Sequence, residues 1–185
     1  MIMNDRTRSI IEEVLKTYQD LPFLSPEDLP SIDLYMDQVT TLIDDKLAPT
    51  RRLPSDKLLT KTMINNYAKN KLLPPPEKKK YSRQQILLLV LIYYFKNSLT
   101  MQDIKTVFDS IPFDEDIYNE VFSDSSQMLG ITRDSIERCL DLSDEKFAET
   151  ENQEKEHLQL FSLICDLLLD IYVKNRIVEQ LIDTL

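Results

Sequence analysis

The chain of 185 residues contains a single glycine, Gly130, and no tryptophan. Glycine supplies the positive-φ positions of phosphate-binding loops and tight hairpins, so its scarcity argues against both glycine-rich nucleotide sites and a protein of many hairpins. There is one histidine, His157, and there are two cysteines, Cys139 and Cys165, without a CxxC pair. A Cys/His metal centre is therefore not expected, and we expect both thiols to be free and buried.

The sequence also lacks any set of residues from which a catalytic mechanism could be built, so we expect neither an enzyme nor a cofactor. The longest apolar run, residues 86–95, is too short to span a bilayer. Charged residues at Asp5, Arg6 and Arg8 rule out the pattern of a signal peptide. These features predict a soluble, cytoplasmic protein without a membrane partner.

Leu, Ile, Lys, Glu and Asp are abundant, which predicts a mainly helical fold. Apolar residues recur at helical spacing in segments separated by proline, glycine or capping residues. The expected helices cover 4–18, 32–47 (capped by Ser31), 60–72, 83–95 (with Ser82 and Gln85 as a capping box) and a segment that starts at Thr100 and ends before Pro112. A proline-containing linker covers 21–30. Two further helices are expected on either side of Gly130, taken as a helix stop, and a long helix covers 158–185.

Charge is distributed unevenly along the chain. The net charge is −10, yet residues 46–83 hold 11 Lys and Arg against two acids, Asp56 and Glu77, so this segment carries +9. A basic island within an acidic protein is typical of a protein that binds nucleic acid through one region. Solvated surface lysines are the simpler alternative, and only the position of the lysines within a motif argues against it.

The helix expected at 60–72 divides into two faces. Met63, Ile64, Tyr67, Ala68 and Leu72 form an apolar face, and the opposite face contains no acid. Asn side chains can pair with adenine and Lys side chains suit phosphates. The candidate DNA-binding residues are those of the polar face and of the basic segments around it: Arg51, Arg52, Lys61, Thr62, Asn65, Asn66, Lys69, Lys78, Lys79, Lys80 and Tyr81.

The order of these segments resembles the DNA-binding domain of MerR-type regulators, with the pattern V-S-x-x-T-L-R-Y-Y-E-x-x-G-L-L-P-P, a wing that ends in Y-S, and two further helices. The matching residues here are 59–75, Tyr81-Ser82 and 99–104. The chain departs from the pattern at Asn65 and Asn66, which replace Arg and Tyr, and in a short wing without glycine. The blocks IDLYMDQV (32–39), TKTMINNY (60–67) and KKYS (79–82) more closely resemble an uncharacterised bacterial family, domain of unknown function 1836, whose members are expected to bind DNA.

The helix expected at 158–185 carries a heptad-like seam with one asparagine: Phe161, Ile164, Leu168, Ile171, Asn175, Val178, Ile182 and Leu185. Such a seam is typical of helix pairing, and MerR-type regulators resemble one another in pairing through a helix that follows the DNA-binding domain. Further apolar residues widen the stripe, which favours burial within a helical bundle. A homodimer interface and an intramolecular core are both consistent with this pattern.

The sequence therefore predicts a mainly α fold: a MerR-like winged helix-turn-helix with a very short wing, plus additional N- and C-terminal helices. The expected parts are an N-terminal helix and linker (1–30), the winged-helix domain (31–112) and a helical C-terminal region (113–185). The expected function is transcriptional regulation, with the helix at 60–72 in the major groove of double-stranded DNA and the lysine-rich wing on phosphates. The alternative is a protein-interaction or adaptor module that keeps this scaffold without reading DNA.

Overall fold

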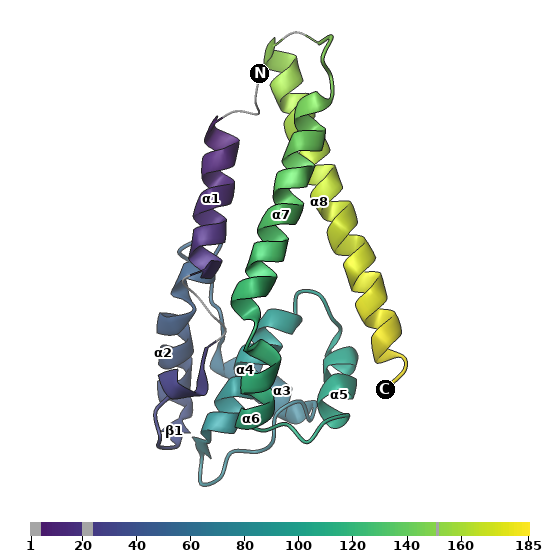
Figure 1. Cartoon of the computed structure of the whole chain (residues 1–185). Helices are drawn as coiled ribbons and strands as arrows, with labels where there is room; N and C mark the ends of the chain where they lie inside the picture. Colours follow the sequence, from purple (N-terminus) through teal and green to yellow (C-terminus); the bar gives the residue numbers. More distant parts are fainter. Residues whose placement is uncertain (1–4, 20–23, 151) are drawn as a thin grey trace. The chain divides into compact units, whose positions relative to one another are not determined.

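The computed structural model describes residues 5–19, 24–150 and 152–185. Asn4 of the first expected helix and residues 21–23 of the expected linker lie outside these ranges. The mainly α prediction is confirmed, because the described residues form helices and only two short strands (Figure 1). The chain divides into two compact units, one made of Met1–Asp20 with Asp124–Ile177 and the other of Leu21–Ser123 with Val178–Leu185. None of the described helices is long and apolar enough to cross a membrane.

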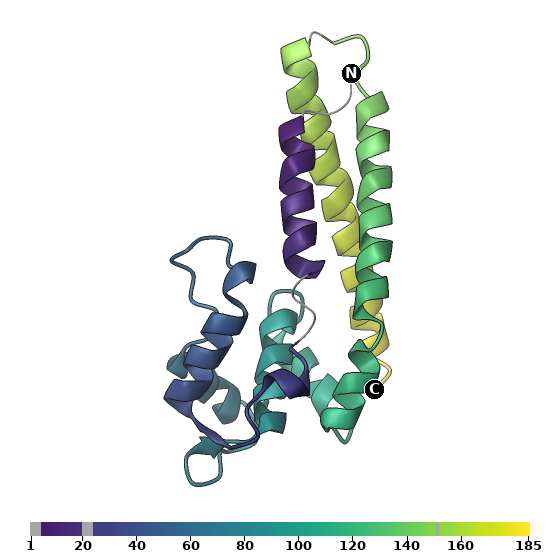
Figure 2. The same cartoon turned by 60° about the vertical axis from the view of Figure 1, so that its left-hand side comes forward.

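The first unit consists of α1 (Asp5–Gln19), α7 (Ser125–Glu145) and most of α8 (Asn152–Ile182), as Figures 1 and 2 show. Its small core forms around Leu140 of α7 and Leu163 of α8, against which Ile11 of α1 packs. Two ion pairs join α1 to α7, Arg8–Asp144 at 3.1 Å and Arg133–Glu12 at 2.7 Å. Cys139 and Cys165 are free, as predicted, but the prediction that both are buried is wrong, because Cys139 is half-buried and Cys165 is exposed on α8.

Helix α7 corrects the prediction that Gly130 stops a helix. The helix runs without interruption through Gly130, and the break falls earlier, at Ser123 and Asp124. A single glycine weakens a helix by only about 1 kcal/mol, which the flanking turns of a long helix can offset.

The second unit is built around α4 (Arg83–Phe95), whose residues 85–92 are all buried, as expected for an apolar run of this length. Around it lie α2 (Met36–Lys46), α3 (Lys61–Lys69), α5 (Met101–Asp109) and α6 (Glu115–Phe122), with the short 3-10 turns η1 (Pro26–Asp28) and η2 (Ala48–Thr50). Strands β1 (Leu34–Tyr35) and β2 (Lys80–Tyr81) pair antiparallel. Helix α6 belongs to this unit because Tyr118 is buried in the same core, so the unit continues past residue 112.

The predicted caps at Ser82 and Thr100 are confirmed, and Ser82 and Gln85 form the expected capping box. Thr60, where the sequence places a helix start, is the N-cap of α3, and its hydroxyl accepts a hydrogen bond from the Met63 amide at 3.2 Å. Thr100 caps α5 in the same way, with Asp103 as its partner. The prediction that Ser31 caps the helix at 32–47 is wrong. Leu34 and Tyr35 form β1, so α2 begins only at Met36, with Tyr35 at its N-cap.

Candidate nucleic-acid interface

The outward face of α3 is the polar, acid-free face that the sequence predicts. Ile64 and Tyr67 are buried, and Met63 and Ala68 are half-buried against the core of the second unit. The exposed residues of the helix are Lys61, Thr62, Asn65, Asn66 and Lys69. They recur every three or four residues and so form one continuous surface. All five side chains can donate a hydrogen bond, which suits a face that meets acceptors.

Lys78 and Lys79 occupy the two central positions of a tight hairpin turn. Glu77 and Lys80 form an antiparallel bridge around them, and the Lys80 amide donates to the Glu77 carbonyl oxygen at 2.8 Å. Both lysines have positive φ, 48° and 66°. This is the pattern of a type I′ turn, in which Asn-Gly and Gly-Gly are the preferred pairs. Placing a residue with a β-carbon in this left-handed region costs about 1 kcal/mol relative to glycine. Both lysines of the turn therefore adopt a backbone conformation that lysine disfavours.

Pairing between β1 and β2 decides which side chains near this turn face outward. The register opposes Leu34 to Tyr81 and Tyr35 to Lys80. Because side chains alternate along a strand, Lys80 faces outward and Tyr81 inward. The Lys80 ammonium lies 5.1 Å from the centre of the Tyr35 ring, and Tyr35 is 52% exposed.

The assignment of Tyr81 to the binding surface is therefore wrong. Its side chain is only 2% exposed and belongs to the core, where burial raises the pKa of its hydroxyl. Tyr35 is the exposed aromatic residue beside the lysines. Strand alternation at residues 80 and 81 separates the two positions only once the pairing of β2 with β1 is known.

Two of the candidate cations are engaged by acids of α2. Arg51 contacts Asp44 at 2.5 Å, and hydrogen bonding to this carboxylate raises the pKa of the guanidinium. Lys61 pairs with Asp37, and both side chains of that pair are well exposed. Exposed ion pairs contribute little stability, so the Lys61 pair is readily exchanged for a phosphate contact.

The loop that carries Arg51 and Arg52 is fixed to the C-terminal end of α4 by two half-buried contacts. The Thr50 and Tyr93 hydroxyls lie 2.6 Å apart, and the Lys96 ammonium donates to the Leu58 carbonyl oxygen at 3.1 Å. Burial lowers the pKa of Lys96, whose ammonium also lies 4.9 Å from the centre of the Tyr93 ring. Arg52 is exposed on this anchored loop.

Lys71 is a surface cation that the sequence reasoning missed. It follows the end of α3 with φ of 59°, and the Leu72 and Lys71 amides donate to the Tyr67 and Ala68 carbonyl oxygens. This is a Schellman cap with lysine at the position that usually holds glycine. The MerR pattern has glycine here, so the signal was visible in the sequence. Among the described residues of the basic segment, those for which no ion pair is found are Arg52, Lys57, Lys69, Lys71, Lys78, Lys79 and Lys80.

The connection between α3 and the hairpin is rigid. Leu72 and Leu73 are buried, and the Gln85 side-chain amide donates to the carbonyl oxygens of Pro74 at 2.9 Å and Pro75 at 3.2 Å. Proline also restricts its own backbone and that of the preceding residue. The outward face of α3, Lys71 and the lysine turn are therefore held by one framework.

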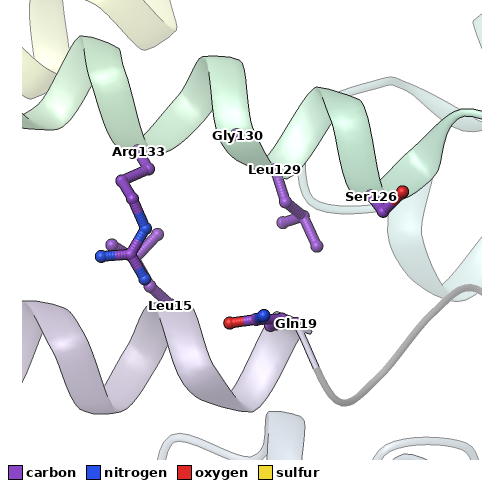
Figure 3. Close-up of a pocket in the computed structure, with 6 residues that line it drawn as sticks. All are labelled: Leu15, Gln19, Ser126, Leu129, Gly130 and Arg133. Carbon is purple, nitrogen blue, oxygen red and sulfur yellow. The ribbon is translucent and has the colours of Figure 1, made fainter.

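One pocket lies in the first unit, and another adjoins the candidate surface at Lys71. In the first unit, Leu15 and Gln19 of α1 face Leu129 and Arg133 of α7 across a space of about 160 Å³ (Figure 3). Its one cation, Arg133, is already paired with Glu12. A second pocket, of about 340 Å³, lies beside the end of α3 and is lined mainly by apolar side chains, including Leu73, Phe108 and Phe113. Within the described ranges, no group of three or more His, Cys, Asp or Glu side chains is placed to hold a metal ion.

Comparison with protein families identifies the region that contains this surface. A family model described as "Domain of unknown function (DUF1836)" matches residues 24–128, more than half of the chain. The chain belongs to the DUF1836 family. No curated protein and no solved structure gave a match.

The DUF1836 match contains every candidate residue from Arg51 to Tyr81, together with all helices of the second unit from α2 to α6. It ends in the first turn of α7, so α8 lies beyond it. The lysine turn, Lys71 and the α3 face are thus features of the DUF1836 domain itself.

Proposed function

We propose that this DUF1836 protein is a DNA-binding transcriptional regulator, and that α2, α3 and the β1–β2 pair act as a winged helix-turn-helix with a very short wing. The outward face of α3 would enter the major groove, and Lys78, Lys79 and Lys80 would contact phosphates. Within this scheme the connection between α2 and α3 is longer than an ordinary helix-turn-helix turn, and it carries Arg51 and Arg52 on an anchored loop.

The lysine turn is the observation that carries the proposal. Two adjacent lysines occupy positive-φ positions, where each costs about 1 kcal/mol relative to glycine. Such outliers concentrate at functional sites, where the local cost is offset by the rest of the fold. A charged tip of this kind suits a polyanion, because phosphate contacts dominate the affinity of proteins for DNA.

The acid-free face of α3 provides the second support. Asn65 and Asn66 can pair with adenine edges and Thr62 can contact a thymine methyl group. Asn70 donates to the Asn66 side-chain oxygen at 3.1 Å, which fixes the orientation of the Asn66 amide. Lys69 and Lys71 extend the same surface toward the backbone of the duplex.

Binding to random-sequence duplex DNA, titrated over a range of salt concentrations, tests the proposal. With four or five phosphate contacts, the logarithm of the affinity should fall with the logarithm of the salt concentration with a slope of about −4. The triple variant Lys78→Glu, Lys79→Glu, Lys80→Glu should lose binding.

A control with the same change in charge is Lys16→Glu, Arg138→Glu, Lys155→Glu on the first unit, which should keep most of the affinity. Absence of binding at low salt, or equal losses in the two triple variants, would rule out the proposed surface. Selection from a random DNA pool then shows whether Asn65→Ala and Asn66→Ala change sequence preference.

The acidic outward face of α2 favours the alternative of a protein-interaction or adaptor module. Asp37 and Asp45 are exposed on this helix, on a side where the backbone of a bound duplex would be repelled. If this alternative holds, the protein does not bind DNA, and a protein partner protects the lysine turn from chemical modification.

A further inference from the structure

Helix α8 has an inner face, which contacts α7 near the start of the helix, and a second face that carries the apolar seam. On the inner face, Leu163 is buried against Leu140, and the Gln159 amide donates to the Asp144 carbonyl oxygen at 2.8 Å. Lys146 donates to Ser162 at 2.7 Å and to Asp166 at 3.0 Å. These contacts pack α8 against α7. One face of the helix therefore has the role in an intramolecular core that the sequence allows.

The seam defined by Phe161, Ile164, Leu168, Ile171, Asn175 and Val178 lies on the other face. Residues two positions apart on a helix point about 200° from one another, so Phe161 and Leu168 point away from Leu163 and Asp166. Phe161 is 64% exposed, Leu168 58% and Ile171 52%. Soluble proteins rarely leave such a continuous apolar stripe uncovered, which marks it as an interface.

The seam ends before the last residues that the sequence assigned to it. Ile182, the next position after Val178, is buried within its own chain, with 7% of its surface exposed. The usable stripe therefore runs from Phe161 to Val178, about five turns of helix.

We infer that two copies of this chain pair along α8, parallel and in register, with Asn175 of one copy against Asn175 of the other. The 3-4 spacing places Phe161, Leu168 and Asn175 at a positions and Ile164, Ile171 and Val178 at d positions. In a parallel pair like positions meet, so each Asn175 amide finds a donor and an acceptor in the other. In an antiparallel pair Asn175 faces an aliphatic residue and its buried amide loses its partner, which is costly.

Charges beside the seam agree with the parallel arrangement. Lys174 occupies a g position and Glu179 the following e position, and these two positions face each other across a parallel pair. The two-fold axis generates this contact twice, on both sides of Asn175. Lys174 also donates to Asp170 of its own helix at 2.7 Å, and its ammonium has further donors for the second copy.

The asparagine in the seam favours an assembly of two copies. Leu at a with Ile at d would by itself favour more than two strands, whereas a single Asn at an a position is a known determinant of oligomeric state and register. The Leu163–Leu140 contact also places α7 beside the start of the seam.

Sedimentation of the full-length protein over a range of concentrations tests the association without DNA, so its result is separate from that of the DNA-binding proposal. The wild type should be a dimer, and Ile171→Asp should be a monomer. Val173→Asp places the same charge at an exposed position off the seam and should remain a dimer. A monomeric wild type, a tetramer, or equal dissociation by both variants would overturn the inference.

Cross-linking tests the orientation. In a background with Cys139→Ala and Cys165→Ser, the variants Phe161→Cys and Val178→Cys are oxidised separately and as an equal mixture. A parallel, in-register pair gives disulfides between like positions only. An antiparallel pair of the stripe opposes Phe161 to Val178, so mixed Phe161→Cys/Val178→Cys products from the mixture would show that arrangement and overturn the assignment. Adding Asn175→Leu should keep the dimer but allow mixed products to appear, because the polar contact that fixes the orientation is gone.

Discussion

At the scale of single residues, lysines stand where the backbone favours glycine. Lys71, Lys78 and Lys79 all have φ between 48° and 66°. Each carries a flexible, charged side chain at a cost in backbone energy. Lys71 forms the Schellman cap of α3, so its contribution to stability can be measured without altering the core.

Lys71→Gly should raise the free energy of unfolding by about 1 kcal/mol, because glycine adopts the left-handed conformation of the cap without the β-carbon penalty. The matched control is Lys69→Gly, two residues earlier in the exposed last turn of α3, where glycine should lower stability by about 1 kcal/mol. Urea unfolding measures both. Effects of the same sign at the two positions would contradict the conformational explanation.

Gly130 presents the reverse case, a glycine where the backbone does not require one. It lies inside α7, and a β-carbon at this position would meet no atom within 4 Å. Gly130→Ala should therefore raise stability by about 0.5–1 kcal/mol through the smaller entropy of the unfolded chain. Thermal unfolding measures the change, with Arg138→Ala on the exposed side of the same helix expected to be nearly neutral. Destabilisation by alanine would show that the space beside Gly130 is used by another group.

At the scale of elements, the lysine turn between α3 and α4 allows stability and function to be separated. Lys78→Asn with Lys79→Gly supplies the preferred type I′ pair and should stabilise the protein by about 1 kcal/mol or more. The same variant should lose DNA affinity, and the magnitude of its salt slope should fall by about 2.

A second variant of the turn isolates the charge. Lys78→Gln with Lys79→Gln removes both charges but keeps the unfavourable backbone, so stability should stay near that of the wild type while DNA affinity falls as far as in the Asn-Gly variant. Salt-dependent DNA titration and urea unfolding of the three proteins give the comparison. A loss of affinity in the Asn-Gly variant alone would assign the effect to the shape of the turn instead of its charge.

Local signals predicted the helix starts well, because Thr60, Ser82 and Thr100 each satisfy a free amide at a helix end. The pairing of β1 with β2 was not visible in the sequence, because two-residue strands are too short for a periodic pattern. Missing that pair shifted the start of α2 and placed Tyr81 on the wrong side. The expected helix stop at Gly130 is wrong for another reason. The many other residues of α7 offset the small loss of helix stability that one glycine causes.

The candidate surface was predicted in composition but not in its electrostatic details. The outward face of α3 follows from helical periodicity, and its residues are the exposed ones. Pairing of Arg51 with Asp44 and of Lys61 with Asp37 depends on how α2 packs, which a charge count along the chain does not reveal. Lys71 stands apart from the runs of charge, and its place on the surface follows from the left-handed backbone that ends α3.

At the scale of the whole molecule, tyrosine burial makes stability depend on alkaline pH. Burial raises the pKa of Tyr67, Tyr81 and Tyr118, all in the core of the second unit, and Tyr118 shows the largest effect. A raised pKa in the folded state means that the stabilising contribution is complete below the unfolded pKa of about 10 and is lost as pH rises through the folded value. The urea midpoint of this unit should therefore be flat near neutral pH and fall steeply above about pH 10.

Tyr118→Phe tests this dependence and separates two effects of one hydroxyl. The side chain is 1% exposed, and among the described residues its hydroxyl has no hydrogen-bond partner. Removing an unsatisfied buried hydroxyl should raise stability by about 1 kcal/mol at neutral pH. The gain should increase above pH 10, because the variant has no phenol to ionise at this position. Tyr172→Phe, at an exposed position on α8, is the matched control and should follow the wild type at every pH. If Tyr118→Phe instead lowers the urea midpoint at neutral pH, the hydroxyl has a polar partner within the core, and the alkaline transition must arise elsewhere.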